Sequence, residues 1–399
     1  MLIAVLYMTE HEDFYFLSQK PFWRQVELSN KRTNYELKPP KCWNVLKRAI
    51  QGKWISKHHD KKELEKINKF FQKTRSYHRI PLSLQRNDGK CGNISFKGTK
   101  MHHYRALCDP EGSTPCCHNN HTCVAFSQAQ CVCDGCYDMR RSVHAELATW
   151  VPRDKTCKLN IYTGEEDLCP VLKNTVIHFV GDSYIRQFFI AFLSVIRSGH
   201  PDRIFAYTNT SADVKAMCDP YYSYFRSCKL LLPSDVPACD GSVKLCLDQK
   251  FLAHNHAKEV LRLVKSYKGK PNSVVVLWMG AWDWFNAKRI IKLLVKPMKM
   301  LLKGQLWPHL IWVSGHSPGL LKAPKKVDDA EAVFTFNHEI EKVIDSQFPI
   351  LDTFFLTKKA GVMSYDGSHY GPGVNDVKAQ LLFNYLNEMR TAGNFKRKP

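Results

Sequence analysis

Three residues in two distant motifs combine a nucleophile, a base and a carboxylate. Ser183 follows the apolar run 175–180 and a Gly-Asp pair, and Asp366 and His369 stand three residues apart near the C-terminus. A serine hydroxyl becomes nucleophilic when a histidine takes its proton, and a carboxylate fixes the tautomer of that histidine. The motifs therefore predict an acyl-enzyme on Ser183, with His369 as the base and Asp366 as its partner.

The surroundings of Ser183 predict a tight turn between a buried strand and an amphipathic helix. From about residue 170, short apolar runs alternate with helical patterns, which is typical of βα units and a parallel sheet. Active sites in such sheets lie beyond the carboxyl ends of the strands. Ser183 would then lie at a helix N-terminus, where free N–H groups favour an oxyanion, and Asp182 would cap that helix.

Further elements are expected on either side of this turn. The spacing of Asp366 and His369 predicts one side of a helical turn, with a polar surface loop as the alternative because Gly-Pro-Gly follows at 371–373. Right-handed crossovers predict a three-layer α/β/α sandwich. The expected strands are 175–180, 273–279, 310–314 and 350–356, and the expected helices are 61–74, 184–197, 257–267, 330–346 and 375–388.

The cysteines indicate an oxidising compartment. Eight of the fifteen lie close together: Cys91, Cys108, Cys116, Cys117, Cys123, Cys131, Cys133 and Cys136. Their density and even number predict disulfides, with a zinc site on the last three as the alternative. Sequons at Asn93, Asn120 and Asn209 predict N-glycosylation and agree with this compartment.

Outside this cluster, the cysteines are more widely spaced. The segment 211–250 contains Cys218, Cys228, Cys239 and Cys246. It is interpreted as a disulfide-pinned insertion over the sheet edge. Cys42 is the candidate for the odd cysteine, which is either free or paired with another chain. The chain then divides into a basic N-terminal region (1–87), a Cys-rich module (88–157) and an α/β catalytic domain (170–392).

The charge of +21 predicts a surface that attracts anions. Anionic glycans are the favoured partners, and nucleic acid is less favoured because no RNA-binding signature or zinc-finger spacing occurs. No transmembrane span is predicted, since no stretch reaches about 18 apolar residues. The apolar start, 1–8, lacks a basic flank and makes a poor signal peptide. We expect a secreted or Golgi/ER-lumenal protein whose N-terminal signal or anchor is missing from this sequence.

The segment 179–187, which contains Gly-Asp-Ser and Arg186, together with Asp366 and His369, resembles the PC-esterase branch of the SGNH (GDSL-like) superfamily. Within it, residues 170–392 are most similar to the C-terminal domain of the neurexophilin and PC-esterase (NXPE) family. The resemblance implies an SGNH fold and O-acyl ester chemistry on carbohydrates. It assigns Ser183 as the nucleophile, His369 as the base and Asp366 as its partner.

The same resemblance calls for a glycine and an asparagine as further oxyanion donors. Gly280 follows a strand at a suitable place, whereas Trp282 or Asp283 stands where the asparagine is expected. Trp282 could donate its indole N–H or stack on a sugar, an ionised Asp283 is expected to point away, and Asn286 is a distant alternative.

Two further side-chain interpretations stay open. Arg186, which matches the family pattern, could bind a substrate carboxylate or form an ion pair within the fold. The histidines His254, His256 and His316 lack companions at ligand spacing, so no metal site is predicted there.

Two functions remain open at this point. The favoured one is a serine-dependent O-acyl esterase or O-acyltransferase acting on glycans of secreted or cell-surface glycoconjugates. A transferase would need a donor such as acetyl-CoA, for which no motif is present, and no other cofactor is expected. The alternative is a catalytically inert secreted protein that binds glycans or proteins on an SGNH scaffold.

Overall fold

The computed structural model describes residues 36–97, 103–198, 204, 211–218, 226–323, 330–358 and 361–395. The apolar start at 1–8 and the sequon at Asn209 lie outside these ranges. Residues Asn34–Pro399 form one compact unit. The boundaries expected at 87 and 157 stay predictions.

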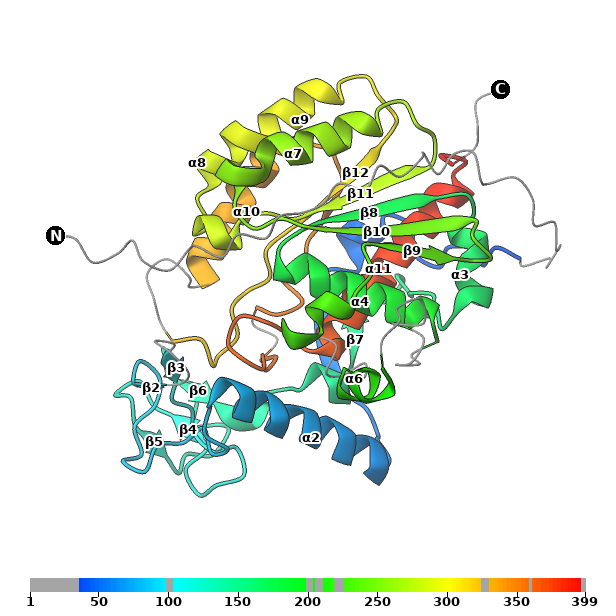
Figure 1. Ribbon diagram of the computed structural model, residues 1–399. Coiled ribbons are helices and arrows are strands. Elements are labelled where there is room, and N and C mark those ends of the chain that lie inside the picture. The colour runs from blue at the N-terminus through cyan, green and yellow to red at the C-terminus, as the bar shows by residue number, and fades with distance from the viewer. Residues whose placement is uncertain are drawn as a thin grey trace. The chain divides into compact units, whose positions relative to one another are not determined.

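A six-stranded sheet lies at the centre of this unit (Figure 1). Five strands run parallel, and the edge strand β9 is antiparallel to β10. The strand order is β13 (Ile350–Leu351), β12 (His309–Val313), β11 (Ser273–Leu277), β8 (Val176–Gly181), β10 (Val243–Gln249) and β9 (Asp235–Ala238). Strand β8 therefore has its carboxyl end between those of β11 and β10.

Helices cover both faces of the sheet, which confirms the predicted three-layer α/β/α architecture (Figure 1). One face carries α3 (Glu165–Leu172), α4 (Ser183–Ile196) and α11 (Pro372–Thr391). The other carries α7 (Ala253–Ser266), α8 (Ala287–Ile290), α9 (Lys296–Leu301) and α10 (Ala330–Ile344), with a π-helical turn at Ile291–Val295 joining α8 to α9. Strand β11 is buried along its whole length and is apolar except for Ser273.

The segment 211–250 differs from the expected insertion. It begins with α6 (Ala212–Met217) and a 3-10 helix, Arg226–Leu231, but ends in β9 and β10, which are strands of the central sheet. Six residues of β10, from Lys244 to Gln249, pair in parallel with all six residues of β8, although Lys244 and Asp248 interrupt the apolar pattern of β10. Because of these two charged residues, the sequence pattern does not predict β10 as a strand. The expected strand 350–356 is also shorter, because only Ile350 and Leu351 pair with β12.

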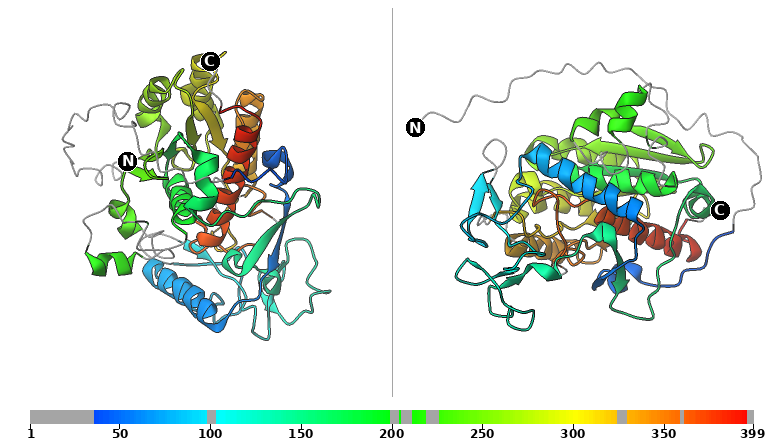
Figure 2. Two further views of the ribbon diagram at one scale, coloured as in Figure 1. Left: turned by 90° about the vertical axis from the view of Figure 1, so that its right-hand side faces the viewer. Right: turned by 90° about the horizontal axis from the view of Figure 1, so that it is seen from below.

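The segment before the sheet adds a separate layer. Strand β1 (Gly52–Ser56) pairs antiparallel with β7 (Ala148–Pro152), and α1 (Val45–Arg48) precedes them. Helix α2 (Lys61–His78) is capped by Asp60, whose carboxylate accepts from the Glu63 N–H. The two views in Figure 2 show α2 on the side of the sheet that carries α4.

In the Cys-rich module the eight cysteines pair with one another: Cys91–Cys117, Cys108–Cys123, Cys116–Cys131 and Cys133–Cys136. Its strands are short: β2 (Ser95–Lys97), β3 (His103–Arg105), β4 (Cys116–Cys117), β5 (Cys123–Val124) and β6 (Tyr137–Asp138). The apolar cluster of the module includes Leu321 and Met363, which come from loops of the α/β region. The module therefore shares a small core with these loops.

Three more disulfides lie outside the module. They are Cys42–Cys157, Cys169–Cys239 and Cys218–Cys228. Cys42 is thus paired, contrary to the expectation, and the free thiol is Cys246, which is buried in β10. Disulfides fit a secreted or lumenal protein. Every helix in the described part of the chain is too short or too polar to cross a membrane.

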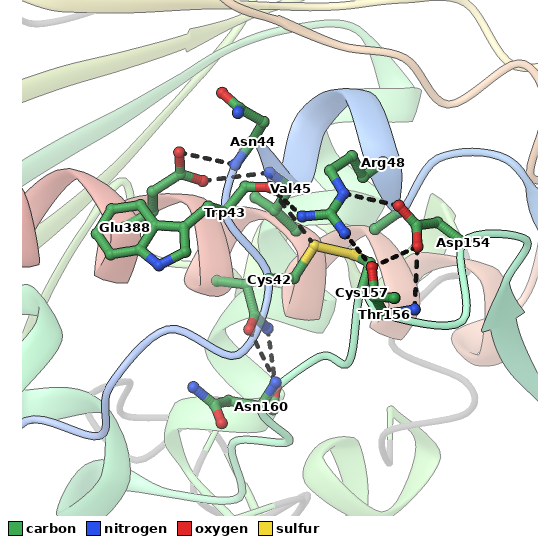
Figure 3. The surroundings of a disulfide bond; sticks show 12 residues. Cys42, Trp43, Asn44, Val45, Arg48, Asp154, Thr156, Cys157, Asn160 and Glu388 are labelled. Atoms are coloured by element: carbon green, nitrogen blue, oxygen red, sulfur yellow. Dashed lines mark hydrogen bonds and ion pairs between the residues drawn. A yellow bond between two sulfur atoms is a disulfide. The ribbon is translucent and has the colours of Figure 1, made fainter.

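The Cys42–Cys157 bridge joins the start of the unit to the segment after β7 (Figure 3). Glu388 of α11 accepts from the N–H groups of Asn44 and Val45, at 2.9 and 3.2 Å. Arg48 donates to Asp154 at 2.7 Å. The bridge therefore lies within a group of contacts that fix α1 against α11.

Removal of this bridge is expected to destabilise the fold strongly. Cys42 and Cys157 are 115 residues apart. A loop of that length gives a loss of about 5 kcal/mol from the greater chain entropy of the unfolded state. The double alanine variant is compared with wild type by urea unfolding. The matched control removes Cys218–Cys228, which are 10 residues apart and predict a loss of about 3 kcal/mol. Equal losses would contradict this prediction.

Candidate active site

The nucleophile turn lies between β8 and α4. Gly181 ends the strand with φ +152°, and a Cβ at this position would collide with the carbonyl oxygen of Trp278 and the side chain of Ile185. Asp182 caps the helix, since its Oδ1 accepts from the Tyr184 N–H at 2.9 Å. Ser183 is therefore the first residue of α4, at the carboxyl edge of the sheet, as the sequence predicts.

The structure brings Ser183, His369 and Asp366 into one hydrogen-bonded series. Ser183 Oγ lies 2.8 Å from His369 Nε2, and His369 Nδ1 lies 2.7 Å from Asp366 Oδ2. In the neutral imidazole, Nδ1–H donates a hydrogen bond to the carboxylate, and Nε2 can then accept one from the serine hydroxyl. The His369 side chain is 24% exposed, so substrate can reach it.

The loop that carries Asp366 and His369 is a bend, and the expected helical turn is not formed. Asp366 Oδ1 accepts from the N–H groups of Ser368 and His369, at 2.8 and 2.7 Å. Gly367 has φ +85°, and a Cβ there would meet the backbone of Lys322. Helix α11 begins after this loop, at Pro372. Asp366 Oδ1 thus fixes the backbone of the loop, and Asp366 Oδ2 orients the imidazole of His369.

The electrostatic environment keeps Asp366 ionised. Burial alone would raise the pKa of this carboxyl, but the charge and hydrogen bonds of His369 and the charge of His78 lower the pKa below its usual range. His78 Nε2 lies 3.9 Å from Asp366 Oδ2, at the last residue of α2. The helix expected at 61–74 stops short of His78, and nothing in the spacing along the chain links His78 to Asp366.

Asp182 is buried in a different environment. Its Oδ2 accepts from Trp278 Nε1 at 3.1 Å. Burial raises the pKa of Asp182 to about 6, against the opposing effect of the Tyr184 N–H and of positive charge at His369 and Arg186. Asp182 holds the turn and the next strand end together, whereas Asp366 is the carboxylate that bonds to Nδ1 of His369.

Aromatic rings enclose the imidazole of His369. Tyr365 is stacked on it, with centroids 5.9 Å apart, and Tyr184 meets it edge-on at 5.5 Å. The Gln187 side chain donates to the Tyr365 hydroxyl, so α4 also holds this ring. These side chains restrict the orientation of His369. Nothing in the sequence predicts this role for them beyond their position next to the motif residues.

A second aromatic pair lies at the carboxyl end of β8. Trp282, in the 3-10 helix Ala281–Asp283, meets Phe251 edge-to-face with centroids 5.6 Å apart. Phe251 follows β10, and Trp282 follows β11. Because β8 lies between these strands, the pair joins the loops on either side of the Ser183 turn. Trp282 remains 53% exposed and can contact a ligand.

The candidate oxyanion donors differ in whether their polar groups are already bonded elsewhere in the fold. Gly280 directly precedes this 3-10 helix, at the end of the strand that adjoins β8. Asp283 is buried and accepts from the Ala253 N–H at 2.8 Å, so its carboxylate faces α7. Asn286 Oδ1 accepts from the Arg289 N–H at 3.0 Å and caps α8. The backbone N–H groups of Ser183 and Gly280 are therefore the better candidates.

Arg186 lies inside the fold. It is buried and donates from Nη1 to Gln249 Oε1, at the end of β10, over 3.2 Å. Its positive charge contributes to lowering the pKa of Asp182. This placement favours the structural interpretation of Arg186 over contact with a substrate carboxylate.

The possible metal ligands are committed to other contacts. The zinc alternative in the Cys-rich module conflicts with the pairing of Cys131 with Cys116 and of Cys133 with Cys136. Two ligand clusters occur in the described part of the chain, and each contains disulfide-bonded cysteines. Of the histidines considered, His256 faces Glu259 at 3.6 Å, and His254 faces Asp283 at 3.9 Å.

The described sequons lie at the surface. Asn93 and Asn120 are both exposed. The hydroxyl of Thr122 donates to Asn120 Oδ1 at 2.6 Å. Both side chains are accessible to a glycosylating enzyme, and glycosylation itself stays a prediction.

Comparison with known proteins gives a likeness in structure but none in sequence. No protein-family model matches the chain, and no curated protein matches its sequence. A solved structure described as a member of the lipolytic protein G-D-S-L family from Veillonella parvula DSM 2008 is similar to it. That likeness covers 53% of this chain and 95% of the other, at 12% identity and a TM-score of 0.29.

Proposed function

We propose that the chain is a serine-dependent O-acyl esterase or O-acyltransferase that forms an acyl-enzyme on Ser183. One observation carries the proposal: Ser183 Oγ, the His369 imidazole and Asp366 Oδ2 form a continuous series with distances of 2.8 and 2.7 Å. Both distances are within the range in which a base takes a proton from a nucleophile. The Gly-Asp-Ser motif and the late Asp-x-x-His support the proposal that the chain belongs to the PC-esterase branch of the SGNH superfamily and, within it, to the NXPE family.

The reaction follows from the placement of the three side chains. His369 Nε2 takes the Ser183 proton as Oγ attacks the acyl carbonyl carbon, while Asp366 stabilises the imidazolium. The backbone N–H groups of Ser183 and Gly280 are the proposed oxyanion donors. The imidazolium then protonates the leaving group, which departs as the ester bond breaks. Water or a sugar hydroxyl attacks the acyl-enzyme in the second half, giving hydrolysis or transfer.

A glycan is the proposed substrate or acceptor. The exposed indole of Trp282 beside the Ser183 turn offers a flat apolar surface for a sugar ring. The net charge of +21 favours anionic glycans. For a transferase, a thioester such as acetyl-CoA is the proposed donor. We propose the Golgi or ER lumen or the extracellular space as the site of action, since seven disulfides require an oxidising compartment.

Detection of the acyl-enzyme tests the proposal. The full chain is mixed with p-nitrophenyl acetate, release of p-nitrophenol is followed, and the quenched protein is digested for mass spectrometry. We expect turnover and an acetyl group on the peptide that contains Ser183. A folded chain that shows neither turnover nor the adduct with this activated ester or with acetyl-CoA would refute the proposed chemistry. It would favour the binding protein instead.

Loss of the Trp282 ring is expected to weaken binding of sugar esters. Stacking on an aromatic ring contributes roughly 0.5–1.5 kcal/mol, so Trp282→Ala should raise KM for an acetylated oligosaccharide about 2- to 13-fold. The KM for p-nitrophenyl acetate should stay unchanged, because that ester has no sugar. Trp43→Ala, which removes an exposed tryptophan beside Cys42, is the matched control. An equal rise in KM for both esters would exclude a sugar-stacking role.

A further inference from the structure

A buried histidine outside the Ser183 series binds the backbone next to His369. His316, in the loop after β12, is 2% exposed. Its Nε2 lies 2.8 Å from the carbonyl oxygen of Ser368. Ser368 precedes His369, and the N–H groups of both residues bond to Asp366. The loop that carries Asp366 and His369, called the catalytic loop below, is thus held at two kinds of group. Asp366 bonds to its N–H groups, and His316 bonds to the carbonyl of Ser368.

A buried lysine contacts the other ring nitrogen of His316. Lys378 of α11 is 2% exposed, and its Nζ lies 3.2 Å from His316 Nδ1. The carbonyl oxygen of Ser368 can only accept, so Nε2 must carry the proton, and in the neutral imidazole Nδ1 is then the acceptor for Lys378 Nζ. Burial, with the positive charge of Lys378, holds the pKa of His316 well below its ordinary value, which keeps the imidazole neutral. Donation therefore runs from Lys378 to His316 and on to the carbonyl of Ser368.

The location of Lys378 is energetically unfavourable for a lysine. An amine in the interior costs free energy that an apolar side chain of similar length would avoid. Burial lowers the pKa of Lys378 to about 7, against the attraction of Asp182. Its contribution is thus geometric: it links α11, the loop after β12 and the catalytic loop at one point.

An aromatic ring couples this pair to the catalytic base. The Tyr184 ring lies 3.8 Å from the His316 ring, centroid to centroid, and meets the His369 ring at 5.5 Å. Lys322 donates to the Ser368 hydroxyl at 2.7 Å from the same loop as His316. A shift of His316 would therefore change both the backbone and the packing next to His369.

We propose that His316 and Lys378 are positioning residues of the active site: they fix the carbonyl of Ser368 and thereby hold the His369 imidazole against Ser183. The proposal rests on the proposed function in that it assigns His369 as the base. Neither residue contacts the reacting atoms, so both act through the geometry of the loop. A displacement of about 1 Å at a reacting group lowers rates by about a hundredfold.

The rate at which a fluorophosphonate labels Ser183 tests the proposal without a known substrate. In this reaction Ser183 Oγ bonds to phosphorus, fluoride leaves, and His369 takes the proton. Lys378→Met and His316→Leu should slow labelling about 10- to 100-fold and lower kcat for p-nitrophenyl acetate in parallel, with KM unchanged. His316→Gln, which keeps a donor for Ser368 and an acceptor for Lys378, should restore most of the rate.

Stability and a matched control separate positioning from simple damage to the fold. Lys378→Met should have a Tm no lower than wild type, because it removes a buried amine. His309→Leu is the control, because it removes a half-buried histidine from the opposite end of β12. His309 Nε2 lies 2.6 Å from the Tyr385 hydroxyl. The labelling rate of this control should stay at the wild-type value. Wild-type labelling in both Lys378→Met and His316→Leu would overturn the proposal.

Imidazole NMR distinguishes failure of this proposal from failure of the proposed function. If wild-type Ser183 is not labelled, the proposed chemistry fails, and the nitrogen shifts of His316 and His369 still test the positioning. We expect His316 as the neutral Nε2–H tautomer, and a shift of the His369 nitrogens in Lys378→Met. The positioning role would be refuted if His316 carried its proton on Nδ1. It would also be refuted if the nitrogen shifts of His369 were the same in wild type and in Lys378→Met.

Discussion

Ser183→Ala is expected to abolish ester hydrolysis almost completely. Loss of a serine nucleophile lowers kcat by about 10⁶-fold in a serine protease, so we expect at least about a thousandfold here, down to the spontaneous rate of p-nitrophenyl acetate. The physical reason is that His369 Nε2 then has no hydroxyl within 2.8 Å to activate. Initial rates of the full-length wild type and variant, measured at equal concentration, give the result.

The control for this substitution is Ser266→Ala. Ser266 is exposed at the end of α7, and its hydroxyl donates to the carbonyl of Leu263 at 2.7 Å. This variant should hydrolyse the ester at the wild-type rate. Full activity in a correctly folded Ser183→Ala protein would show that another residue performs the reaction.

Asp366→Asn is expected to lower kcat by about 10⁴-fold, the effect seen when the carboxylate of a serine protease triad becomes an amide. The amide group would donate to His369 Nδ1 and so place the imidazole proton on Nε2. In that tautomer the base cannot accept the Ser183 proton. The amide oxygen can still accept from the N–H groups of Ser368 and His369, so the loop should keep its shape.

The matched control is Asp109→Asn, at an exposed carboxylate that accepts from the Glu111 N–H at 3.0 Å. It should leave kcat unchanged. An Asp366→Asn protein with wild-type kcat would remove Asp366 from the proposed series. The kcat should be measured across pH, since a tautomer effect persists where a simple shift of the pH optimum would not.

Asp366 also predicts how stability depends on pH. His369 and His78 lower the pKa of Asp366 in the folded state despite its burial. The resulting stabilisation is fully present above the unfolded pKa of about 4 and is lost as pH falls through the lower folded pKa. The stability advantage of wild type over Asp366→Asn should therefore shrink below about pH 4, as measured by urea unfolding at each pH.

The sequence identified the parts of the site that have local signatures. The turn at Ser183 could be predicted because Gly181 and Asp182 meet steric and capping needs that only a few residue types satisfy. The parallel sheet could be predicted from uninterrupted apolar runs such as that of β11. Strand β10 was missed because Lys244 and Asp248 interrupt its apolar pattern near the ends.

The remaining site residues have no local signature. His78 reaches Asp366 only because α2 lies against the catalytic loop, where Phe70 meets Tyr365 with centroids 6.0 Å apart. Lys378 reads as the polar side of an amphipathic helix, yet its side chain is buried. Such contacts depend on how distant elements pack, which spacing along the chain does not encode.

The disulfides and strand pairings bear on how a recombinant catalytic fragment should be cut. A fragment of residues 170–392 would begin one residue after Cys169 and leave its partner Cys239 as an extra thiol. It would also lack α2, and with it His78 and Phe70. Expression trials should therefore start upstream of Cys42, and an inactive shorter fragment would say nothing about the chemistry of Ser183.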